Sequence, residues 1–404
     1  MRDVFIVDAI RTPRGKGKPD GHHHVLRPVY LAAHVLSKII ERHEIESQFI
    51  EDVIIGCATQ VGEQGGCIAK AACFEAGFSQ NVCGLTVNRF CGSGLESVNL
   101  AAAKIGYEQN ELLIAGGVES MSRVSMGSDG SAMASDPTTS TKVNFVPQGI
   151  SADLIATINR YSRRDLDQWA VESHKRADYA QNNGFFKNSI IPILDLLGNP
   201  YLSYDELVRS KTDMETLAKL RPSFEYIGEN FGFDKRAINK YPFLEKINHI
   251  HHPGNSSSIV DAASSVILAS ERAIKEHGLV PRAKIRSTAL GGTEPTIMLT
   301  GTIPATQNAL KKADLSIEDI DLFEVNEAFA SVVLNTIDTL KLDPEKVNVN
   351  GGSIAMGHPL GATGSILLGT LLDELERRDQ RIGLVTLCIG GGMGITTIIE
   401  RVEN

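Results

Sequence analysis

Short apolar runs alternate with helix-like segments through the first 120 residues of the chain. The runs are rich in Val, Ile and Leu, and the segments between them repeat apolar residues at helical spacing. Such an alternation of strands and helices predicts an α/β fold built on a parallel sheet. The expected strands are residues 4–7, 52–56, 85–87 and 111–116, and the expected helices are residues 31–42, 69–76 and 95–105.

The same alternation returns from Ala283 onward, in an order that resembles the first part of the chain. Each part contains a strand, a Gly-containing loop, a helix and a further strand. This repeat predicts a duplicated fold in which both sets of loops lie where strand ends meet, as in the active sites of open α/β sheets. The expected strands are residues 284–290, 322–325, 347–350 and 383–387, and the expected helices are residues 328–340 and a Gly-rich helix from Gly361.

Between these two parts the pattern changes. Residues 126–146 are rich in Gly, Ser, Thr, Asp and Pro and show no periodicity. Residues 162–181 predict an amphipathic helix that opens with a Ser-Arg-Arg-Asp capping pattern. Residues 259–273 predict another, Ala-rich amphipathic helix.

Two groups of histidines are candidate metal ligands. His22–His24 are adjacent in a loop and cannot all face one ion, so a solvated loop is favoured. His249 and His251 alternate, as neighbours on one face of a strand would. Glu245 is the only carboxylate close to them in sequence, which favours structural histidines. We therefore expect no metal site.

Composition narrows the function classes. The chain has 404 residues, of which 42% are hydrophobic and 22% charged, as in a soluble globular protein of two or three domains. A net charge of −9 gives no support for nucleic-acid binding over the whole chain. No apolar run reaches the length that spans a membrane, so membrane insertion is not expected.

Cysteine usage indicates the compartment. Five of the six cysteines lie between Cys57 and Cys91, and none forms a C-x-x-C pair. This spacing argues against a zinc site or a disulfide framework and for a reducing compartment. The first residues form a short strand-like run with Asp3 and Asp8, unlike a signal peptide. We expect a cytoplasmic protein.

The middle of the chain is locally basic. A solvated face is the usual explanation for such charges, and a cap that binds an anion is the more specific one. The basic residues are Arg160, Arg163, Arg164, Lys175, Arg176, Arg209, Lys211, Lys219 and Arg221.

Cys91 lies between the strand that ends at Val87 and the following helix. Unpaired N–H groups and the helix dipole at such a position favour a thiolate, which is where a covalent nucleophile would be placed. Gly92 and Gly94 would let backbone or a thioester approach closely. Two alternatives remain open: a small buried core cysteine, and a dinucleotide-binding turn, although the third glycine of that motif is absent.

Three further clusters lie at strand ends in the second part. Asn326 follows one strand, His358 lies in a bed of small residues, and Cys388 ends another strand before three glycines. Together with Cys91 they supply a nucleophile, an imidazole, a second thiol, an amide and backbone N–H donors. Acyl transfer through a thioester requires these parts.

Five blocks in this order resemble the thiolase family, of the acetyl-CoA C-acyltransferase type, and the resemblance covers essentially the whole chain. The blocks are Asn88-Arg-Phe-Cys-Gly-Ser-Gly94, Gly116-Gly-Val-Glu-Ser-Met-Ser122, Asn326-Glu-Ala-Phe-Ala330, Gly351-Gly with Gly357-His-Pro-Leu-Gly361, and Cys388-Ile-Gly-Gly-Gly-Met-Gly394.

The resemblance implies an α/β, duplicated five-layer αβαβα thiolase-like fold with an inserted loop domain. Residues 1–122 with 257–280 would form the N-terminal core half, 123–256 the inserted, CoA-covering loop domain, and 281–404 the C-terminal core half. The implied enzyme cleaves 3-ketoacyl-CoA with coenzyme A, or runs the reverse Claisen condensation, in fatty acid β-oxidation. It would be a homodimer or homotetramer.

The resemblance also implies residue roles. Cys91 would be acylated, and His358 would take its proton and help bind an oxyanion beside a water held by Asn326. Cys388 would act as acid and base on the acetyl-CoA enolate, and backbone N–H groups of Cys91 and Gly390 would form a second oxyanion hole. Coenzyme A is the expected co-substrate, with no permanently bound cofactor and no metal. The implied coenzyme contacts are Arg209, Ser257 and Phe329.

Two departures bear on the substrate. Short-chain acetoacetyl-CoA thiolases carry His-Met-Gly where this chain has Pro147-Gln148-Gly149, so the methionine that helps close the acyl pocket is missing. The segment 225–253 is also longer than in compact thiolases. We therefore favour a 3-ketoacyl-CoA thiolase that accepts more than acetoacetyl-CoA over a biosynthetic acetoacetyl-CoA-forming enzyme.

Other classes of protein are less favoured. A ketoacyl synthase normally pairs its cysteine with two histidines, whereas Asn326 and Cys388 occupy the partner positions here. A nicotinamide-dependent oxidoreductase would rest on Gly92-Ser-Gly94 alone. A non-catalytic CoA-binding protein would have no use for the nucleophile, the imidazole and the second thiol.

Overall fold

The strand order is the same in the two halves of the chain. In the computed structural model, which describes residues 2–402, each half places its first strand beside its last, and the strand before the last comes next. The matching series outward from the centre are β1-β6-β5-β3 and β7-β10-β9-β8, and β4 extends the first half at its outer edge. The halves meet where β1 and β7 pair through Phe5 with Lys284 and Ile6 with Ala283. In spatial order the strands are β4 Cys83–Val87, β3 Asp52–Gly56, β5 Leu112–Ser120, β6 Val260–Ser270, β1 Val4–Arg11, β7 Ala283–Gly292, β10 Met393–Arg401, β9 Ile382–Ile389 and β8 Leu322–Val325, and β2 Gly15–Lys16 pairs with β6.

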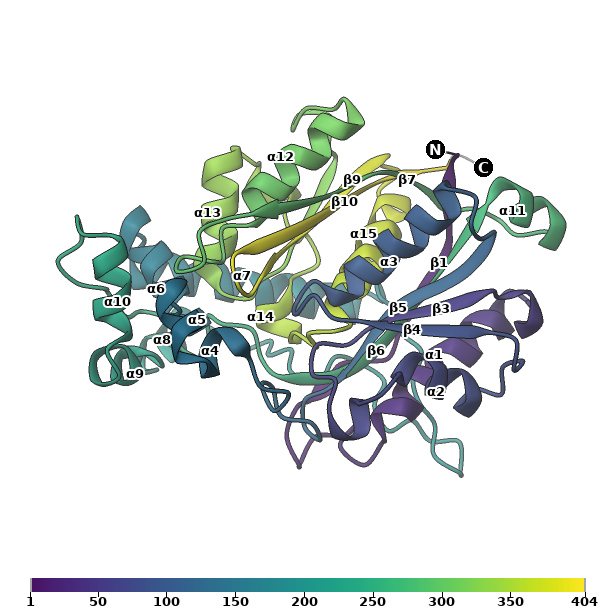
Figure 1. Cartoon of the computed structure of the whole chain (residues 1–404), viewed down its shortest axis with the longest axis horizontal. Helices are drawn as coiled ribbons and strands as arrows, with labels where there is room; N and C mark the ends of the chain where they lie inside the picture. The colour runs from purple at the N-terminus through teal and green to yellow at the C-terminus, as the bar shows by residue number, and fades with distance from the viewer. Residues whose placement is uncertain (1, 403–404) are drawn as a thin grey trace.

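Helices form three layers around these strands (Figure 1). The central layer is α3 Ser93–Gly106 packed on α15 Thr363–Arg377, one helix from each half. Their buried faces share one core, which includes Leu95, Val98, Leu368 and Leu371. The outer layers are α1 Pro28–Arg42 with α2 Ile68–Glu75 on the first half, and α12 Thr302–Ala313 with α13 Ala330–Leu340 on the second. The expected duplicated five-layer arrangement is therefore confirmed.

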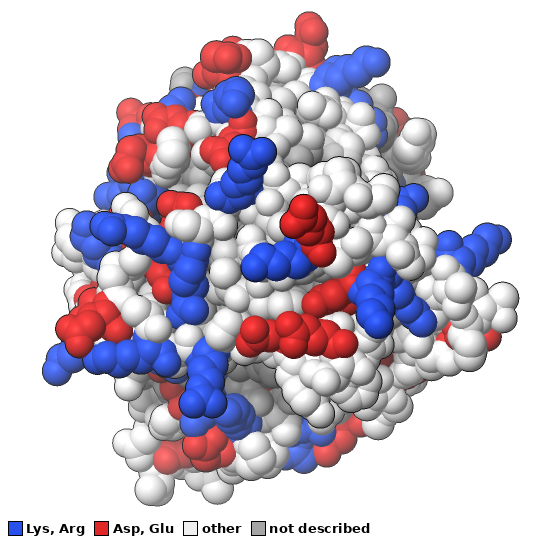
Figure 2. Space-filling model, turned by 90° about the vertical axis from the view of Figure 1, so that its left-hand side faces the viewer, with Lys and Arg blue, Asp and Glu red and all other residues white. Residues whose placement is uncertain are grey.

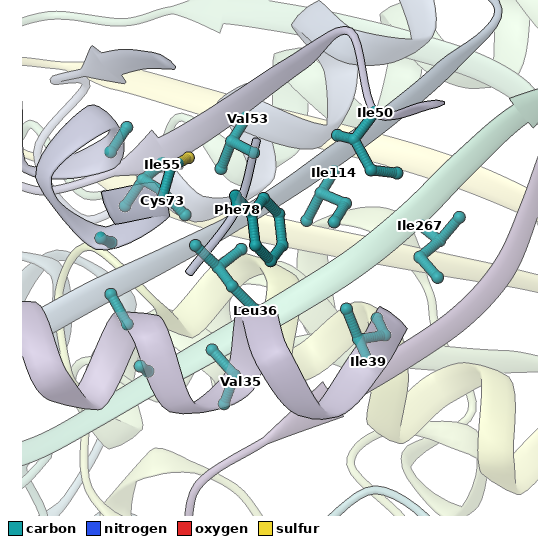
Figure 3. Close-up of a cluster of buried hydrophobic side chains, with 14 of the residues drawn as sticks. Val35, Leu36, Ile39, Ile50, Val53, Ile55, Cys73, Phe78, Ile114 and Ile267 are labelled. Atoms are coloured by element: carbon teal, nitrogen blue, oxygen red, sulfur yellow. The ribbon is translucent and has the colours of Figure 1, made fainter. Parts of the chain in front are cut away.

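Apolar periodicity explains the outer packing (Figure 3). In α1, Val35, Leu36 and Ile39 recur on one face and are fully buried. They pack in one cluster with Ile55 of β3 and Ile114 of β5. Burial of a side chain of this size contributes about 1.5–3 kcal/mol, so this face fixes α1 to the sheet.

Between β5 and β6, the secondary-structure elements of the described chain are helices. The predicted helix 162–181 is observed as α7 Arg163–Asn182, with the capping box between Ser162 and Asp165. The other helices here are α4 Ala132–Ser135, α5 Pro137–Lys142, α6 Gln148–Asn159, α8 Met214–Ala218, α9 Glu225–Asn230 and α10 Phe233–Lys240, and the core halves add α11 Glu271–His277 and α14 Ser353–Met356.

Three expectations for secondary structure are wrong. The predicted helix 259–273 is largely strand β6, which lies between β5 and β1 with both faces buried. A continuous run of small and apolar residues suits a strand buried on both faces, and periodicity cannot distinguish it from a buried helix. Residues 347–350 form no strand beyond one bridge from Val347 to Phe323. The sheet is mixed rather than parallel, since β6 and β10 run antiparallel to their neighbours.

The histidines of the two groups differ in burial and in their hydrogen-bond partners. The solvated-loop expectation is wrong for His23, which is fully buried, whereas His22 contacts Glu206 and His24 contacts Ser122. No strand contains His249 or His251.

These two side chains instead share one carboxylate. Their Nδ1 atoms lie 2.8 and 2.7 Å from the carboxylate oxygens of Asp153 in α6. They hold α6 in place, as structural histidines do.

Hydropathy gives one further result. In the described part of the chain, residues 2–402, no helix is both long and apolar enough to cross a membrane.

Candidate active site

Cys91 sits on a sharp turn between β4 and α3. Phe90 before it has a φ of +47°, a conformation that non-glycine residues rarely adopt. The turn is held by hydrogen bonds from Phe90 N–H to Asn88 Oδ1 at 2.8 Å and from Ser93 Oγ to the Phe90 carbonyl at 2.6 Å. Such a strained, pinned turn presents one side chain in a fixed direction. Cys91 is 5% exposed.

The glycines after Cys91 allow close packing. A Cβ on Gly92 would lie 2.4 Å from Ile389 Cδ1, and one on Gly94 would lie 2.7 Å from the Gly361 carbonyl oxygen. The expected close approach of backbone is observed at Gly94, where the Gly361 carbonyl of the second half occupies the space. The expectation that a thioester also approaches here stays a prediction.

The turn between β9 and β10 meets Cys91 from the second half. Residues 390–392 are all glycine, and Gly391 and Gly392 have φ values of +81° and +82°, which glycine adopts without strain. Gly390 and Gln148 line the same cavity as Cys91, and the Gly390 N–H and the Gln148 amide act to lower the pKa of the Cys91 thiol. Burial nevertheless raises the pKa of the Cys91 thiol to about 11. Burial thus outweighs the helix dipole, and the expected preference for the thiolate is wrong for the unliganded protein.

Cys388 is the second thiol of this region. It is the penultimate residue of β9, is 1% exposed, and packs with Phe329 and Ala328. Burial, and then the neighbouring Cys91, raise its pKa well above that of a free thiol. Cys388 is therefore held as a thiol close to Cys91.

A chain of hydrogen bonds fixes the ring of His358. The Thr363 hydroxyl donates to the Pro359 carbonyl at 2.9 Å, so its oxygen accepts from His358 Nδ1 at 2.5 Å. Nδ1 therefore carries the proton, and Nε2 is left with a lone pair. The Asn326 amide nitrogen lies 3.3 Å from Nε2.

The orientation of that amide is fixed in turn by Ser353. The Ser353 hydroxyl donates to Asn326 Oδ1 at 2.7 Å, which directs the amide nitrogen toward His358. Burial, with Arg14 adding to it, lowers the pKa of His358 to about 3. The imidazole is thus neutral, with Nε2 unprotonated.

Glu119 ties the loops of the two halves together. Its buried carboxylate accepts hydrogen bonds from the N–H groups of Ala58 at 2.8 Å, Thr59 at 3.1 Å and Gly361 at 2.8 Å, and from Gln64 Nε2 at 2.8 Å. Gly361 is three residues after His358, so this carboxylate sets the distance between the His358 loop and the first half.

A cavity of about 420 Å³ opens onto Cys91. All three parts of the chain contribute to its mostly apolar wall. Its lining residues include Cys91, Met126, Asp129, Met133, Phe145, Gln148, Met298, Phe329, Leu360 and Gly390. His358, Asn326 and Cys388 are buried and are not among the residues that line the cavity.

The expected coenzyme-binding residues are not all together. Phe329 lines the cavity, and the N–H of Ser257 donates to the carbonyl of Ala328 beside it at 2.9 Å. The side chain of Arg209 is exposed and is not part of the cavity wall. Its backbone N–H donates to His174 Nδ1 at 3.1 Å.

The basic residues of the middle region divide into two groups. One group forms ion pairs with residues three or four positions away, and its members are Arg163, Lys175, Arg176 and Lys219. Figure 2 shows this side of the molecule, where blue and red side chains are interspersed. Among residues 2–402, the basic residues of this region that form no ion pair are Arg160, Arg164, Arg209, Lys211 and Arg221.

Three residues around the site had no predicted role. Gln148 stood out only as a departure from the short-chain pattern, and Thr363 gave no signal beyond its place in a Gly-rich loop. Glu119 could have been recognised from the sequence. It is a charged residue next to an apolar, strand-like run, and a charge buried in a strand needs several hydrogen-bond partners.

Comparison with known proteins decides the family. The chain matches the thiolase N-terminal domain over residues 4–230 and the thiolase C-terminal domain over residues 279–401. The chain belongs to the thiolase family. Thiolases are acyltransferases, so the predicted enzyme class is confirmed, and the oxidoreductase and ketoacyl synthase alternatives are set aside.

Relatives match this thiolase along its whole length. The 3-ketoacyl-CoA thiolase of Photobacterium profundum is 39% identical over 410 residues, covering 100% of both chains. Those of Colwellia psychrerythraea and Klebsiella pneumoniae are 38% and 39% identical, with 100% of each chain covered.

The hydrogen-bond chain around His358 predicts its titration. Because its folded pKa of about 3 lies below the ordinary value of 6.5, the unfolded chain binds a proton first as the pH falls. Stability should therefore decrease between about pH 6.5 and 3. Nitrogen-15 NMR of histidine-labelled protein should show His358 neutral and protonated at Nδ1 from pH 5 to 8, assigned by its absence in His358→Asn.

Thr363 provides a matched pair of variants for this test. Thr363→Val leaves Nδ1–H without an acceptor, which costs about 1–3 kcal/mol, whereas Thr363→Ser keeps the oxygen. The Nδ1 signal should shift in the valine variant only. A His358 that titrates near pH 6.5 in the wild type would contradict the arrangement.

Proposed function

We propose that this protein cleaves 3-ketoacyl-CoA with coenzyme A into acetyl-CoA and a shortened acyl-CoA, or runs the reverse condensation. The observation that carries the proposal is the convergence of Cys91, Gly390 and Cys388. Cys91 and Gly390 line one cavity, and Cys388 lies two residues before Gly390 at the end of β9, close enough to Cys91 for the two thiols to interact. Full-length relatives named 3-ketoacyl-CoA thiolase support the substrate class.

The first half-reaction would form an acyl-enzyme on Cys91. The Cys91 thiol gives its proton to His358 Nε2, and the sulfur attacks the 3-keto carbon. The N–H groups of Cys91 and Gly390 bind the resulting oxyanion. The bond between C2 and C3 then breaks, and the acetyl-CoA enolate takes a proton from the Cys388 thiol. A water held by Asn326 and the protonated His358 bind the enolate oxygen.

The second half-reaction would release the shortened product. A coenzyme A thiol gives its proton to the Cys388 thiolate and attacks the acyl-enzyme carbonyl. The Cys91 sulfur leaves and recovers its proton from His358. Two half-reactions through one covalent intermediate give ping-pong kinetics.

Coenzyme A would act as co-substrate, without a permanently bound cofactor. The proposed contacts are Phe329 and Ser257 at the cavity and Arg209 on the surface. Residues 123–256 would form the inserted loop domain that covers the coenzyme, between a first half of residues 1–122 with 257–280 and a second half of residues 281–404. The unpaired basic side chains of that loop region support a role in binding phosphates.

The cavity supports substrates longer than acetoacetyl-CoA. Its wall carries flexible or large apolar side chains, among them Met126, Met133, Met298 and Leu360, which suit an alkyl chain. Gln148 replaces the methionine that would close a short pocket.

We also propose a homodimer or homotetramer in the cytoplasm. The outer edge of β4 is unpaired among residues 2–402, and Leu85 on this strand is 38% exposed. An open strand edge of this kind pairs readily with another chain. All six cysteines are free, as in a reducing compartment. Light scattering should give a multiple of the 43.7 kDa chain mass, and a monomer would contradict the assembly.

Mass spectrometry tests the nucleophile. After incubation with acetyl-CoA, the wild type should carry one acetyl group on the Cys91 peptide and Cys91→Ala none. Cys388→Ala should still be acetylated, yet carbon–carbon cleavage should fall by about 100-fold or more, because a positioned acid–base group contributes that much.

The controls separate the two roles. Cys67→Ala, at an exposed thiol of α2's N-cap, should change neither result. Acetylation of another cysteine, or loss of acetylation in Cys388→Ala, would overturn the division of labour.

A chain-length profile tests the substrate range. Thiolysis rates should be higher for at least one longer 3-ketoacyl-CoA than for acetoacetyl-CoA, because the cavity wall offers apolar contacts that a short acyl group cannot reach. A profile in which acetoacetyl-CoA equals or exceeds every longer substrate would favour the acetoacetyl-CoA-forming alternative.

A further inference from the structure

Gln148 reaches the reactive sulfur from outside both core halves. It is the first residue of α6, and its side chain lines the same cavity as Cys91. Its Nε2 lies 3.0 Å from the position that a Cβ on Gly390 would occupy. The amide is thus beside Gly390, which lines the cavity together with Cys91.

The position of Gln148 is fixed by packing behind it. Gly149 lies under Phe224, where a Cβ would be 2.3 Å from the ring. One turn on, Ser151 Oγ donates to the Thr296 carbonyl at 2.7 Å, which joins α6 to the second core half. Asp153 is held by His249 and His251 from the segment 225–253. The start of α6 is therefore anchored on two sides.

We propose that Gln148 is a catalytic residue whose amide N–H donates a hydrogen bond to the Cys91 sulfur and stabilises its thiolate. The inference rests on the proposed role of Cys91 as nucleophile. It makes the inserted region a direct contributor to the chemistry as well as a cover for the coenzyme.

The other groups around Cys91 explain why a further donor is needed. Glu119 opposes a negative sulfur, and Asp129 lies on the same cavity wall. Cys388, beside Cys91, is held as a neutral thiol and offers no positive charge. His358 is neutral. The groups that favour the thiolate are the Cys91 and Gly390 N–H groups and the Gln148 amide.

The residue type matters because the methionine expected here in short-chain thiolases has no hydrogen-bond donor. Gln148 keeps a similar unbranched length and adds an amide. The departure from the short-chain pattern therefore changes the electrostatics at the sulfur as well as the shape of the pocket.

Alkylation by iodoacetamide reports the Cys91 thiolate independently of turnover. Labelling of the Cys91 peptide should be followed by mass spectrometry between pH 7 and 9.5 in the wild type, Gln148→Met and Gln148→Glu. Loss of one hydrogen bond to a charged group raises a pKa by about one unit or more. Because a more basic thiolate is also more nucleophilic, alkylation of Gln148→Met should slow by about threefold to tenfold.

Gln148→Glu should slow further, since it places a negative charge against the sulfur. The matched control is Gln80→Leu, at an exposed glutamine outside the site, which should alkylate as the wild type does. Far-ultraviolet circular dichroism checks folding, and Gln148→Glu, which preserves size, keeps the test decisive if Gln148→Met misfolds.

The outcomes separate the two proposals. Equal or faster alkylation of Cys91 in both Gln148 variants, while the wild type still forms the acetyl adduct, would overturn the role of Gln148 alone. Absence of the acetyl adduct in the wild type would instead overturn the proposed function.

Discussion

A single buried carboxylate holds the reactive region together. Glu119 lies near the end of the central strand of the first half and accepts hydrogen bonds from the connection between β3 and α2 in that half and from Gly361 of the second. The close approach of the halves depends on this contact, since the Gly361 carbonyl packs where Gly94 and Gly117 leave no room for a Cβ. A backbone-to-carboxylate bond of this kind is stronger than a neutral one. It fixes the His358 loop without using any side chain of that loop.

The duplication is structural, and the chemistry it supports is asymmetric. Equivalent helices α3 and α15 pack on each other, and each follows a loop at a strand end. The first half presents a thiol on a strained turn, whereas the second presents an imidazole, an amide and another thiol. One fold used twice therefore supplies complementary groups that neither half carries alone.

Much of this arrangement could be predicted from the sequence, for reasons that differ by element. β3 and β8 were found with their observed bounds because short Val- and Ile-rich runs are bounded by polar residues. β6 was mistaken for a helix because both its faces are buried. Cys91, His358 and Cys388 were found from their Gly-rich surroundings. The depressed pKa of His358, the raised pKa of Cys91 and the contact of Gln148 were not, because each arises from burial among segments far apart in the chain.

The burial of Cys91 has a consequence beyond acyl transfer. Peroxide oxidises thiolates, and it does so fastest at exposed, acidic cysteines. With 5% exposure and a pKa of about 11, Cys91 offers very little thiolate at neutral pH and little access. In the proposed mechanism this sulfur becomes nucleophilic only while a neighbouring base takes its proton, which would shield it from sulfenic acid formation between turnovers. Resistance to oxidation would thus follow from placing the proposed nucleophile inside the fold.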